Sequence, residues 1–397
     1  MANSMTPDAL QPIVHYVRRM RLADGGVVRA VADLADAVAR TGRPVSIITT
    51  DSDEEARIWP DISPNLRLVR SPEPVRMIGA LPRPVAEEAA RASILHLHTP
   101  WDRGNPALSR FARRAGIPCV LSTHGMLDEW SMSQRAAKKR LYLSVFGRRV
   151  LEGVAAVHCT AEAEWTQARR WVPRARGVVV PLVFDLADYR DLPGPALAQG
   201  HWPEIDTGQP VVLFLSRLHY KKGPEVLVDA VGLLRERGVG ARCVFAGPGE
   251  ADAVAALRRR AAGLGVDGQM LYTGMVAGAE KVSLYQAADV FVLPTSQENF
   301  GFVFFEALAA GTPVVTTRGV DTWPELESSG GAVLVERDPA AIADAIEGLL
   351  NDDARRAKMG AAGRVWTLDR FAPGKVVNEY LSLYDRLAQG AAPSPDG

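Results

Sequence analysis

Two glutamates with seven residues between them, Glu298 and Glu306, lie in a segment where acidic residues are unusual. Glu306 falls in the apolar segment 302–310, which predicts a largely buried helix, and a buried carboxylate needs a partner or its pKa rises. Glu298 precedes this helix, where free backbone N–H groups favour an anion. One helix across the whole interval would set the carboxylates roughly 12 Å apart, close to the ribose-to-sugar distance of a nucleotide-diphosphate sugar. A helix cap at Glu298 and a core hydrogen bond at Glu306 would also explain the pair.

A second group of chemically useful residues is basic. Arg217 and Lys222 lie between the predicted strand 211–215 and the next predicted helix. Cations between a strand end and a helix N-terminus form an anion site, although ordinary surface charge explains the same pattern. His124 follows the predicted strand 120–123, and the carboxyl end of a parallel strand is the ligand-binding edge of a sheet. A hydrogen-bonded loop histidine is the alternative for His124.

Glycines mark two further loops that could face a ligand. Gly25 and Gly26 lie between the predicted strand 13–17 and a helix. Such a turn lets the backbone approach a phosphate at the helix start, although a plain tight turn explains it equally well. Gly247 begins a glycine-rich turn after the predicted strand 243–246. This turn is too short for a dinucleotide fingerprint, and we expect it to face a nucleotide.

Two patterns resemble metal sites, and we assign neither to a metal. Asp51 and Asp53 follow a predicted strand, where a polar loop is expected. His96 and His98 share one face of the predicted strand 94–98, but the sequence shows no third ligand nearby. We expect a structural or substrate-facing role for the two histidines, and neither a metal site nor a cofactor in the protein.

The scaffold that must position these residues is an alternation of strands and helices. Strand-like runs alternate with helical stretches throughout, as is typical of parallel α/β domains. With 397 residues the chain can form two domains with sizeable cores. The segment 191–209 is rich in Pro, Gly and small residues and predicts a linker. We expect an N-terminal domain at 1–190, a C-terminal domain at 210–370 and a disordered tail at 388–397.

Charge and composition exclude several classes of protein. The 46 basic residues balance 46 acidic ones, which argues against a general nucleic-acid binder. No apolar run approaches the length of a membrane span, and the N-terminus lacks a basic-then-apolar signal, so we expect a cytoplasmic protein. Cys119, Cys159 and Cys243 lie in or beside apolar strand-like runs, which predicts buried, reduced thiols.

The segment Gln134–Val150 predicts a basic amphipathic helix. Apolar residues are interspersed with its cations, which are Arg135, Lys138, Lys139, Arg140, Arg148 and Arg149. A helix of this kind can lie on anionic lipid or attract a lipid-diphosphate acceptor. We therefore expect that it can contact the inner face of a membrane peripherally, with a solvated charged face as the commoner explanation.

One stretch carries a family resemblance. Leu293–Thr317 reads LPTSQENFGFVFFEALAAGTPVVTT, and it resembles the Glu-x7-Glu segment of the family 4 retaining glycosyltransferases (glycosyl transferases group 1), which have the GT-B fold. Ser216–Gly223 resembles the second signature of this family, Ser-Arg-Leu-x3-Lys-Gly. Ser122–Trp130 is similar to a subset that builds bacterial polysaccharides. The resemblance covers nearly the whole chain, with the specific motifs concentrated in the second domain.

The resemblance implies a fold and a division of labour. The fold would be two Rossmann-like domains with parallel sheets facing across a cleft, with a final helix, 371–387, crossing back to the first domain. The first domain would bind the acceptor and the second a nucleotide-sugar donor.

The resemblance also implies residue roles. Glu306 would accept from the ribose hydroxyls, Glu298 and His124 would reach the donor sugar, and Arg217 and Lys222 would hold the diphosphate. His124, Glu298, Arg217 and Lys222 would be the catalytic residues. The remaining predicted donor contacts, mostly made through backbone, are Gly25, Gly26, Gly247, Met275, Val276, Asn299, Phe300 and Gly301.

The implied reaction is transfer of a sugar from a UDP- or GDP-sugar to a hydroxyl of a glycan, glycolipid or small-molecule acceptor. It would proceed with retained configuration and without a metal. The alternatives are a GT-B nucleotide-sugar isomerase, a phosphorylase, and a non-catalytic nucleotide-sugar-binding protein. A phosphorylase would depend on free phosphate, and a non-catalytic binder would show neither transfer nor slow donor hydrolysis.

Overall fold

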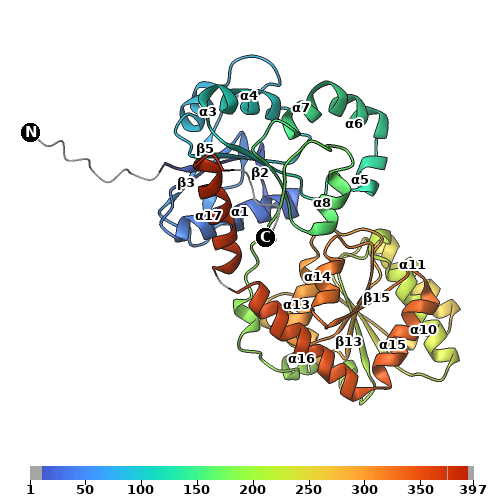
Figure 1. The fold of residues 1–397 in the computed structure, drawn as a ribbon. Helices are drawn as coiled ribbons and strands as arrows, with labels where there is room; N and C mark the ends of the chain where they lie inside the picture. The colour runs from blue at the N-terminus through green and yellow to red at the C-terminus, as the bar shows by residue number, and fades with distance from the viewer. Residues whose placement is uncertain (1–10, 373, 392–397) are drawn as a thin grey trace, which may run out of the picture. The chain divides into compact units, whose positions relative to one another are not determined.

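The computed structural model describes residues 11–372 and 374–391 and divides into two compact units (Figure 1). One unit contains the residues up to Val183 together with those after Ala372, and the other is Phe184–Ala372. The first unit is therefore discontinuous in sequence. Of the tail predicted to be disordered, residues 392–397 lie outside the described part, whereas Ala388 is the last residue of a helix.

The first unit is built on a seven-stranded sheet in the order β5-β3-β1-β6-β7-β8-β9, in which every neighbouring pair is parallel. Its five inner strands are buried on both faces, whereas the edge strands β5 and β9 are partly exposed. They are β1 (Ile13–Tyr16), β3 (Val45–Thr49), β5 (Leu66–Arg70), β6 (Ile94–His98), β7 (Cys119–Ser122), β8 (Ala156–Cys159) and β9 (Gly177–Val179). A separate two-stranded pair joins β2 (Arg19–Met20) to β4 (Asp51–Ser52).

Helices connect the strands of this sheet. They are α1 (Gly26–Arg40), α2 (Glu55–Ile58), α3 (Arg83–Ala89), α4 (Asn105–Ala115), α5 (Glu129–Ser133), α6 (Ala136–Tyr142), α7 (Arg148–Leu151) and α8 (Glu162–Ala168). The last helix, α17 (Lys375–Ala388), is drawn in red beside blue elements of this unit (Figure 1). The Tyr384 hydroxyl lies 2.8 Å from His96 Nδ1, and Arg43 pairs with Asp385 at 2.9 Å. The chain thus returns to its first unit after completing the second.

The basic segment 134–150 was predicted to be one amphipathic helix, and this prediction is wrong because the segment is divided into shorter helical pieces. Arg135 has a left-handed conformation (φ 54°) and separates α5 from α6. A π-helical stretch, Leu143–Gly147, then joins α6 to α7. A Cβ at Gly147 would lie 2.8 Å from the end of the Leu143 side chain, so that side chain would have to shift. Exposed Leu141 lies on this segment among the exposed cations.

The second unit has a parallel six-stranded sheet in the order β12-β11-β10-β13-β14-β15. Its strands are β10 (Val211–Leu215), β11 (Arg242–Ala246), β12 (Met270–Gly274), β13 (Val290–Leu293), β14 (Val314–Thr317) and β15 (Ala332–Val335). Its helices are α9 (Ala196–His201), α10 (Pro224–Glu236), α11 (Ala251–Gly263), α12 (Gly278–Ala287), α13 (Phe302–Ala310), α14 (Trp323–Ser328), α15 (Pro339–Leu350) and α16 (Asp353–Arg370).

The segment predicted as a linker, 191–209, is instead an ordered part of the second unit. It contains α9, whose Ala198 N–H donates to Ser283 Oγ on α12 at 3.0 Å. The Gly194 N–H donates to Gln286 Oε1, also on α12, at 2.7 Å. Pro195 precedes α9 and Pro203 begins the 3-10 turn that follows it, so a composition typical of linkers gave the wrong boundary.

Candidate functional site

Both sheets reverse their strand order at one place, and the predicted site residues follow the strands on either side. The reversal lies between β1 and β6 in the first unit and between β10 and β13 in the second. At such a point the loops after adjacent strands diverge and leave a crevice in which doubly wound folds bind ligands. Arg217 and Lys222 follow β10, and Glu298 follows β13. The second unit therefore brings these three residues to its own switch point.

Lys222 and Glu298 form an ion pair across this switch point. Their side chains are 14% and 24% exposed, so the pair is largely shielded from water. Burial, together with the charges of Arg217 and Lys221, lowers the pKa of Lys222 to about 8, and the Glu298 carboxylate acts in the opposite direction. Arg217 is exposed, and it forms no ion pair with any of the described residues. The arrangement is a partly desolvated ammonium beside a free guanidinium, which suits a diphosphate.

The two loops that carry this ion pair are fastened to each other. The Lys221 carbonyl accepts hydrogen bonds from the Ser296 N–H at 2.7 Å and the Thr295 hydroxyl at 3.0 Å. Gly223 has φ 72°, and a Cβ there would lie 2.3 Å from the Pro294 carbonyl oxygen. The close approach of the two loops therefore requires glycine at position 223.

Arg337, which the sequence analysis did not identify, makes hydrogen bonds to both of these loops. It follows β15, and its guanidinium donates to the carbonyls of Pro294 at 3.0 Å and Tyr220 at 2.9 Å. It also pairs with Glu225 at 3.1 Å. Its place at the end of the last parallel strand is the one feature of the sequence that could have indicated this positioning role.

Glu298 lies in extended backbone and not at the first turn of a helix. Its N–H donates to the Gly319 carbonyl, and its carbonyl accepts from the Asp321 N–H, each at 2.9 Å. Helix α13 begins only at Phe302, so the predicted helical spacing between Glu298 and Glu306 does not apply. The two glutamates are held by different partners.

The residues between Glu298 and α13 have separate structural reasons. Gly301 has φ 70°, and a Cβ there would lie 2.5 Å from the Phe304 ring. The Asn299 amide donates to Asp321 at 3.2 Å. The Phe300 side chain is buried in an aromatic cluster, so only its backbone is available to a ligand.

Glu306 has the partners that a buried carboxylate requires. Its side chain is 12% exposed, and it accepts from Lys281 at 2.8 Å and from the Tyr285 hydroxyl at 3.0 Å, both on α12. Burial and the Glu306 charge raise the pKa of Tyr285 well above its usual value, so this hydroxyl remains a donor. Each carboxylate oxygen keeps a lone pair for a further hydrogen bond. A core hydrogen bond and a ligand contact are compatible here.

The other predicted contacts of the second unit differ from one another in exposure. Gly247 has φ 133°, and a Cβ there would lie 2.1 Å from the Ser216 carbonyl oxygen, so packing between β10 and β11 already requires glycine. Met275 is 72% exposed and Val276 is buried. A ligand beside these two residues would meet the Met275 side chain and the Val276 backbone.

In the first unit, a buried carboxylate shapes the loop that carries His124. His124 follows β7 and has φ 49°, which is unusual for a residue with a side chain. Glu164 accepts from the Thr123 hydroxyl at 2.6 Å and the Gly125 N–H at 2.5 Å, on either side of His124. The Thr160 N–H and hydroxyl donate to its other oxygen at 2.6 and 2.8 Å. Burial alone would raise the pKa of Glu164, but these donors hold it below its usual value.

His124 is also the end of a chain of buried histidines. His98 Nδ1 lies 3.0 Å from His124 Nε2, and His98 Nε2 lies 3.0 Å from His15 Nδ1. Burial lowers the pKa of His15 to about 3 and that of His124 to about 4, so the rings are neutral at physiological pH. His15 Nε2 is buried without a hydrogen-bond partner among the described residues. A buried N–H without an acceptor costs more than a buried lone pair without a donor, so His15 carries its proton on Nδ1. His15 Nδ1–H then donates to His98 Nε2, and His98 Nδ1–H donates to His124 Nε2. The proton of His124 is therefore on Nδ1, where it can be donated to a ligand.

The structure supplies the third histidine that the sequence did not show beside His96 and His98. Ligand atoms of His15, His96 and His98 lie within 4.8 Å of one another. The His96 and His98 rings are stacked at 4.4 Å with planes 25° apart, and those of His15 and His98 are stacked 17° apart. The facing nitrogens of His15 and His98 already form a hydrogen bond, His15 Nδ1 to His98 Nε2 at 3.0 Å. Both nitrogens of His96 are also hydrogen-bonded, to Tyr384 and Ser122.

Gly25 and Gly26 are exposed at the N-terminus of α1, after β1 and at the same sheet edge as His124. Gly25 has φ 96°, and nothing lies within 4 Å of a Cβ placed at either glycine. In the next loop, Asp51 pairs with Arg21 and Asp53 accepts from the Leu22 N–H at 2.8 Å. These two aspartates stabilise the loop that precedes α1.

Comparison with known proteins identifies the family. Residues 25–182 match the family model described as Glycosyl transferase 4-like domain, and residues 202–366 match Glycosyl transferases group 1. A GDP-mannose-dependent alpha-(1-6)-phosphatidylinositol monomannoside mannosyltransferase of Mycobacterium tuberculosis is 34% identical over 319 residues, which is 76% of this chain and 78% of that protein. The chain belongs to the group 1 glycosyltransferases.

Further relatives and solved structures are similar to this glycosyltransferase over most of its length. A D-inositol 3-phosphate glycosyltransferase of Acidothermus cellulolyticus is 30% identical over 400 residues, 92% of this chain and 86% of that protein. HepE of Anabaena, solved with UDP, has a TM-score of 0.76 at 17% identity over 94% of this chain and 98% of its own. Sucrose-phosphate synthase of Thermosynechococcus elongatus has a TM-score of 0.72 at 22% identity, covering 96% and 100%. The predicted α/β fold of the GT-B type is confirmed.

Within this glycosyltransferase, the predicted residues fall into two groups that follow the two units. Arg217, Lys222 and Glu298 lie together in the second unit, and Glu306 is held separately by α12. His124 belongs to the first unit. In the described part of the chain, none of the helices has the length and apolar content that crossing a bilayer takes. All three cysteines are buried, and none of them is in a disulfide among the described residues, as predicted.

Proposed function

We propose that this glycosyltransferase moves a hexose from a UDP- or GDP-sugar to an acceptor hydroxyl, with retained configuration at C1 and without a metal ion. The observation that carries the proposal is the Lys222–Glu298 ion pair, with Arg217 beside it, at the switch point of the second unit. It is supported by relatives whose names specify GDP-mannose, and by a structural neighbour solved with UDP.

The ion pair suggests how the donor enters. A diphosphate carries more negative charge than a carboxylate, so it replaces Glu298 as the counter-ion of Lys222. Glu298 is then free to turn to the hydroxyls of the donor sugar. When the bond from C1 to the diphosphate breaks, the negative charge on the leaving group grows beside Lys222 and Arg217, which stabilise it in place. No step requires a metal.

Glu306 binds the ribose of the donor, at the opposite end from the sugar that is transferred. Lys281 and Tyr285 hold its carboxylate in one orientation, and the remaining lone pairs accept from the ribose hydroxyls. The acceptor hydroxyl attacks C1 from the face that the leaving diphosphate occupies. As the new bond to C1 forms and the bond from C1 to the diphosphate breaks, the hydroxyl proton passes to the leaving phosphate oxygen. The first unit binds the acceptor, which we propose is a glycolipid or a polyol.

A donor panel tests the proposal. The full chain is heated with UDP-, GDP- and ADP-sugars, and the hits are assayed for slow donor hydrolysis and for the anomer released. We expect one nucleotide class to raise Tm, with hydrolysis unaffected by a chelator and the C1 configuration retained. A panel without any shift contradicts the proposal. Activity that depends on free phosphate indicates a phosphorylase, and binding without hydrolysis or transfer indicates a non-catalytic binder.

A further inference from the structure

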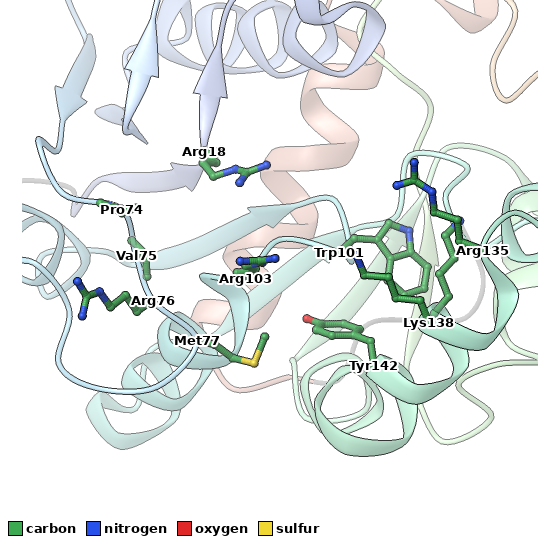
Figure 2. A pocket seen from close by; sticks show the side chains of 11 residues that line it. Arg18, Pro74, Val75, Arg76, Met77, Trp101, Arg103, Arg135, Lys138 and Tyr142 are labelled. Atoms are coloured by element: carbon green, nitrogen blue, oxygen red, sulfur yellow. The ribbon is translucent and has the colours of Figure 1, made fainter.

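The carboxyl edge of the sheet in the first unit is hollowed where its strand order reverses. A cavity of about 760 Å³ lies there, and the residues that line it include Arg18 after β1 and Trp101 after β6 (Figure 2). A hollow of this size admits a small molecule. His124 follows β7, the next strand of the sheet, so it lies at an edge that a ligand can reach.

A row of three histidines, His15, His98 and His124, leads from the interior to this edge. His15 on β1 and His98 on β6 are 0% and 2% exposed, whereas His124 is half-buried. Two contacts of 3.0 Å link the row, His15 Nδ1 to His98 Nε2 and His98 Nδ1 to His124 Nε2. His124 Nδ1 has no hydrogen-bond partner in the described part of the chain. The row therefore ends in one nitrogen that is left for a ligand.

The His98 ring, in the middle of the row, has a fixed orientation. It stacks on the His96 ring at 4.4 Å and on the His15 ring at 5.3 Å. Burial lowers the pKa of His98 well below its usual value, so the ring is neutral and has one proton for its two nitrogens. His98 therefore donates to one neighbour in the row and accepts from the other.

His96 is held by a second set of hydrogen bonds, which ends at a backbone carbonyl. Burial lowers the pKa of His158, and its Nε2–H donates at 2.8 Å to the Val180 carbonyl, which can only accept. His158 Nδ1 then accepts from the Ser122 hydroxyl, and the Ser122 oxygen accepts from His96 Nε2–H, each at 2.7 Å. His96 Nδ1 accepts from the Tyr384 hydroxyl at 2.8 Å. The proton of His96 is thus used within this set, and the row of three histidines is not branched.

The backbone of His124 is fixed separately from its ring. Buried Glu164 accepts from the Thr123 hydroxyl at 2.6 Å and from the Gly125 N–H at 2.5 Å. These bonds hold the residues on both sides of His124. With the backbone held by Glu164 and the ring by His98, the remaining freedom of His124 is which nitrogen carries its proton.

We propose that His98, oriented by His15, is a positioning residue that keeps the proton of His124 on Nδ1, so that this N–H donates to a hydroxyl oxygen of the donor sugar. Imidazole in water favours the proton on Nε2. The His98 Nδ1–H occupies His124 Nε2 and so selects the less common form, which leaves a donor for the lone pairs of the sugar hydroxyl. This assignment rests on the proposed function, because it gives His98 a role in the same transfer reaction.

The first measurement uses the full chain without substrate. Its seven histidines are labelled with the heavy nitrogen isotope, and the signals of His124 are those that His124→Gln lacks. Nitrogen chemical shifts distinguish a protonated from an unprotonated ring nitrogen. At neutral pH we expect a neutral His124 ring with its proton on Nδ1. A proton on Nε2 overturns the proposal.

Variants then separate positioning from packing. His98→Phe keeps a ring beside its neighbours and removes both nitrogens, whereas His98→Asn keeps an amide N–H in the place of Nδ1–H. Tyr384→Phe is the matched control, because it removes one buried hydrogen bond from His96 and leaves the row intact. Rates are measured as hydrolysis of whichever nucleotide-sugar raises the Tm of the wild type.

The three variants should differ in rate and in the spectrum of His124. We expect His98→Phe to lower kcat/KM about 5- to 30-fold, as loss of one oriented hydrogen bond to the substrate implies. Its half-buried His124 ring can then turn Nε2 toward water, so the two nitrogens should show averaged shifts. His98→Asn should keep the proton on Nδ1 and recover at least part of the rate. Tyr384→Phe should lower Tm and leave the rate within about twofold.

Three results would overturn the positioning role of His98. They are an unchanged His124 spectrum with wild-type hydrolysis in His98→Phe, an equal loss of rate in Tyr384→Phe, and a rate in His98→Asn no higher than in His98→Phe. If His98→Phe does not fold, the wild-type spectrum and the rate of His98→Asn still decide the question.

Failure of this inference is distinct from failure of the proposed function. Intact donor hydrolysis with the proton of His124 on Nε2 rejects only the positioning role. A wild type that neither binds nor hydrolyses any nucleotide-sugar rejects the proposed function, and the spectrum without substrate still tests the row.

Discussion

The ammonium of Lys222 makes donor affinity depend on pH in a way that arginine at the same position would not. The perturbation is a rise from pH 7 to pH 9, applied to the wild type and to Lys222→Arg. Because burial and the neighbouring cations lower the pKa of Lys222 to about 8, its proton is lost within this range. Arginine keeps its charge throughout, since its pKa lies far higher.

The magnitude follows from that pKa. With a value of about 8, roughly nine in ten Lys222 side chains are protonated at pH 7 and roughly one in ten at pH 9. A diphosphate that binds the protonated form loses about tenfold in affinity between these pH values, or about 1.4 kcal/mol. The sign is fixed, because a bound anion favours the ammonium and raises the pKa of Lys222 in the complex. Affinity therefore falls as pH rises, and near pH 8 binding takes up about half a proton.

Calorimetry with the donor nucleotide at several pH values, in two buffers of different ionisation enthalpy, measures both quantities. The Lys222→Arg variant is the control for titration of the nucleotide itself, which both proteins share. Parallel affinity profiles for the two proteins, or no proton uptake by the wild type near pH 8, would refute the assignment of Lys222 to the diphosphate. Glu298→Gln removes the opposing carboxylate and should move the fall in affinity to lower pH.

Four further changes test other parts of the structure. Glu306→Gln should weaken nucleotide binding about 5- to 30-fold in calorimetry, because a neutral amide accepts more weakly from ribose hydroxyls, and unchanged affinity would contradict the ribose assignment. Glu298→Gln should lower kcat at least tenfold, because the amide replaces the carboxylate that turns to the donor sugar, and a loss confined to KM would point to simple donor binding. Gly247→Ala should destabilise the fold by roughly 2–4 kcal/mol in denaturant titrations, since its Cβ would overlap the Ser216 carbonyl, and a near-neutral effect would show that the loops can separate. Acid should destabilise the first unit, because the pKa of His15 is about 3 in the folded chain and 6.5 in the unfolded chain. The contribution of neutral His15 to the free energy of unfolding is complete above pH 6.5 and is lost as pH falls toward 3, with about 1.4 kcal/mol lost at pH 5.5. Hydrogen exchange in the first unit as a function of pH measures this loss.

The fold class was predictable because its signals are local. Buried parallel strands read as apolar runs, and the turns between strand and helix carry glycine or proline. The boundary near residue 190 was not predictable, because the same Pro- and Gly-rich composition serves both a flexible linker and short turns packed on α12. The break at Arg135 had no signal either, since arginine rarely adopts a left-handed conformation.

The site shows the same division between local and distant causes. Arg217, Lys222 and Glu298 lie in motifs that the sequence displays, but the ion pair of Lys222 with Glu298 depends on β10 and β13 being neighbours in the sheet. His15 escaped notice for a similar reason. It is opposite His96 in the register of β1 and β6, although the two are far apart in the sequence. Glu164 likewise takes its donors from two strand ends that only the folded sheet brings together.

The discontinuity of the first unit has a consequence for how the protein is made. A ribosome completes Phe184–Ala372 before it synthesises α17, so the second unit is the first to have all of its residues. Until α17 emerges, His96 and His158 lack the hydroxyl partners that Tyr384 and Tyr380 provide. The hydrogen bonds of the buried histidines in the first unit are therefore completed only after α17 has been synthesised. A truncation before α17 should leave the second unit folded.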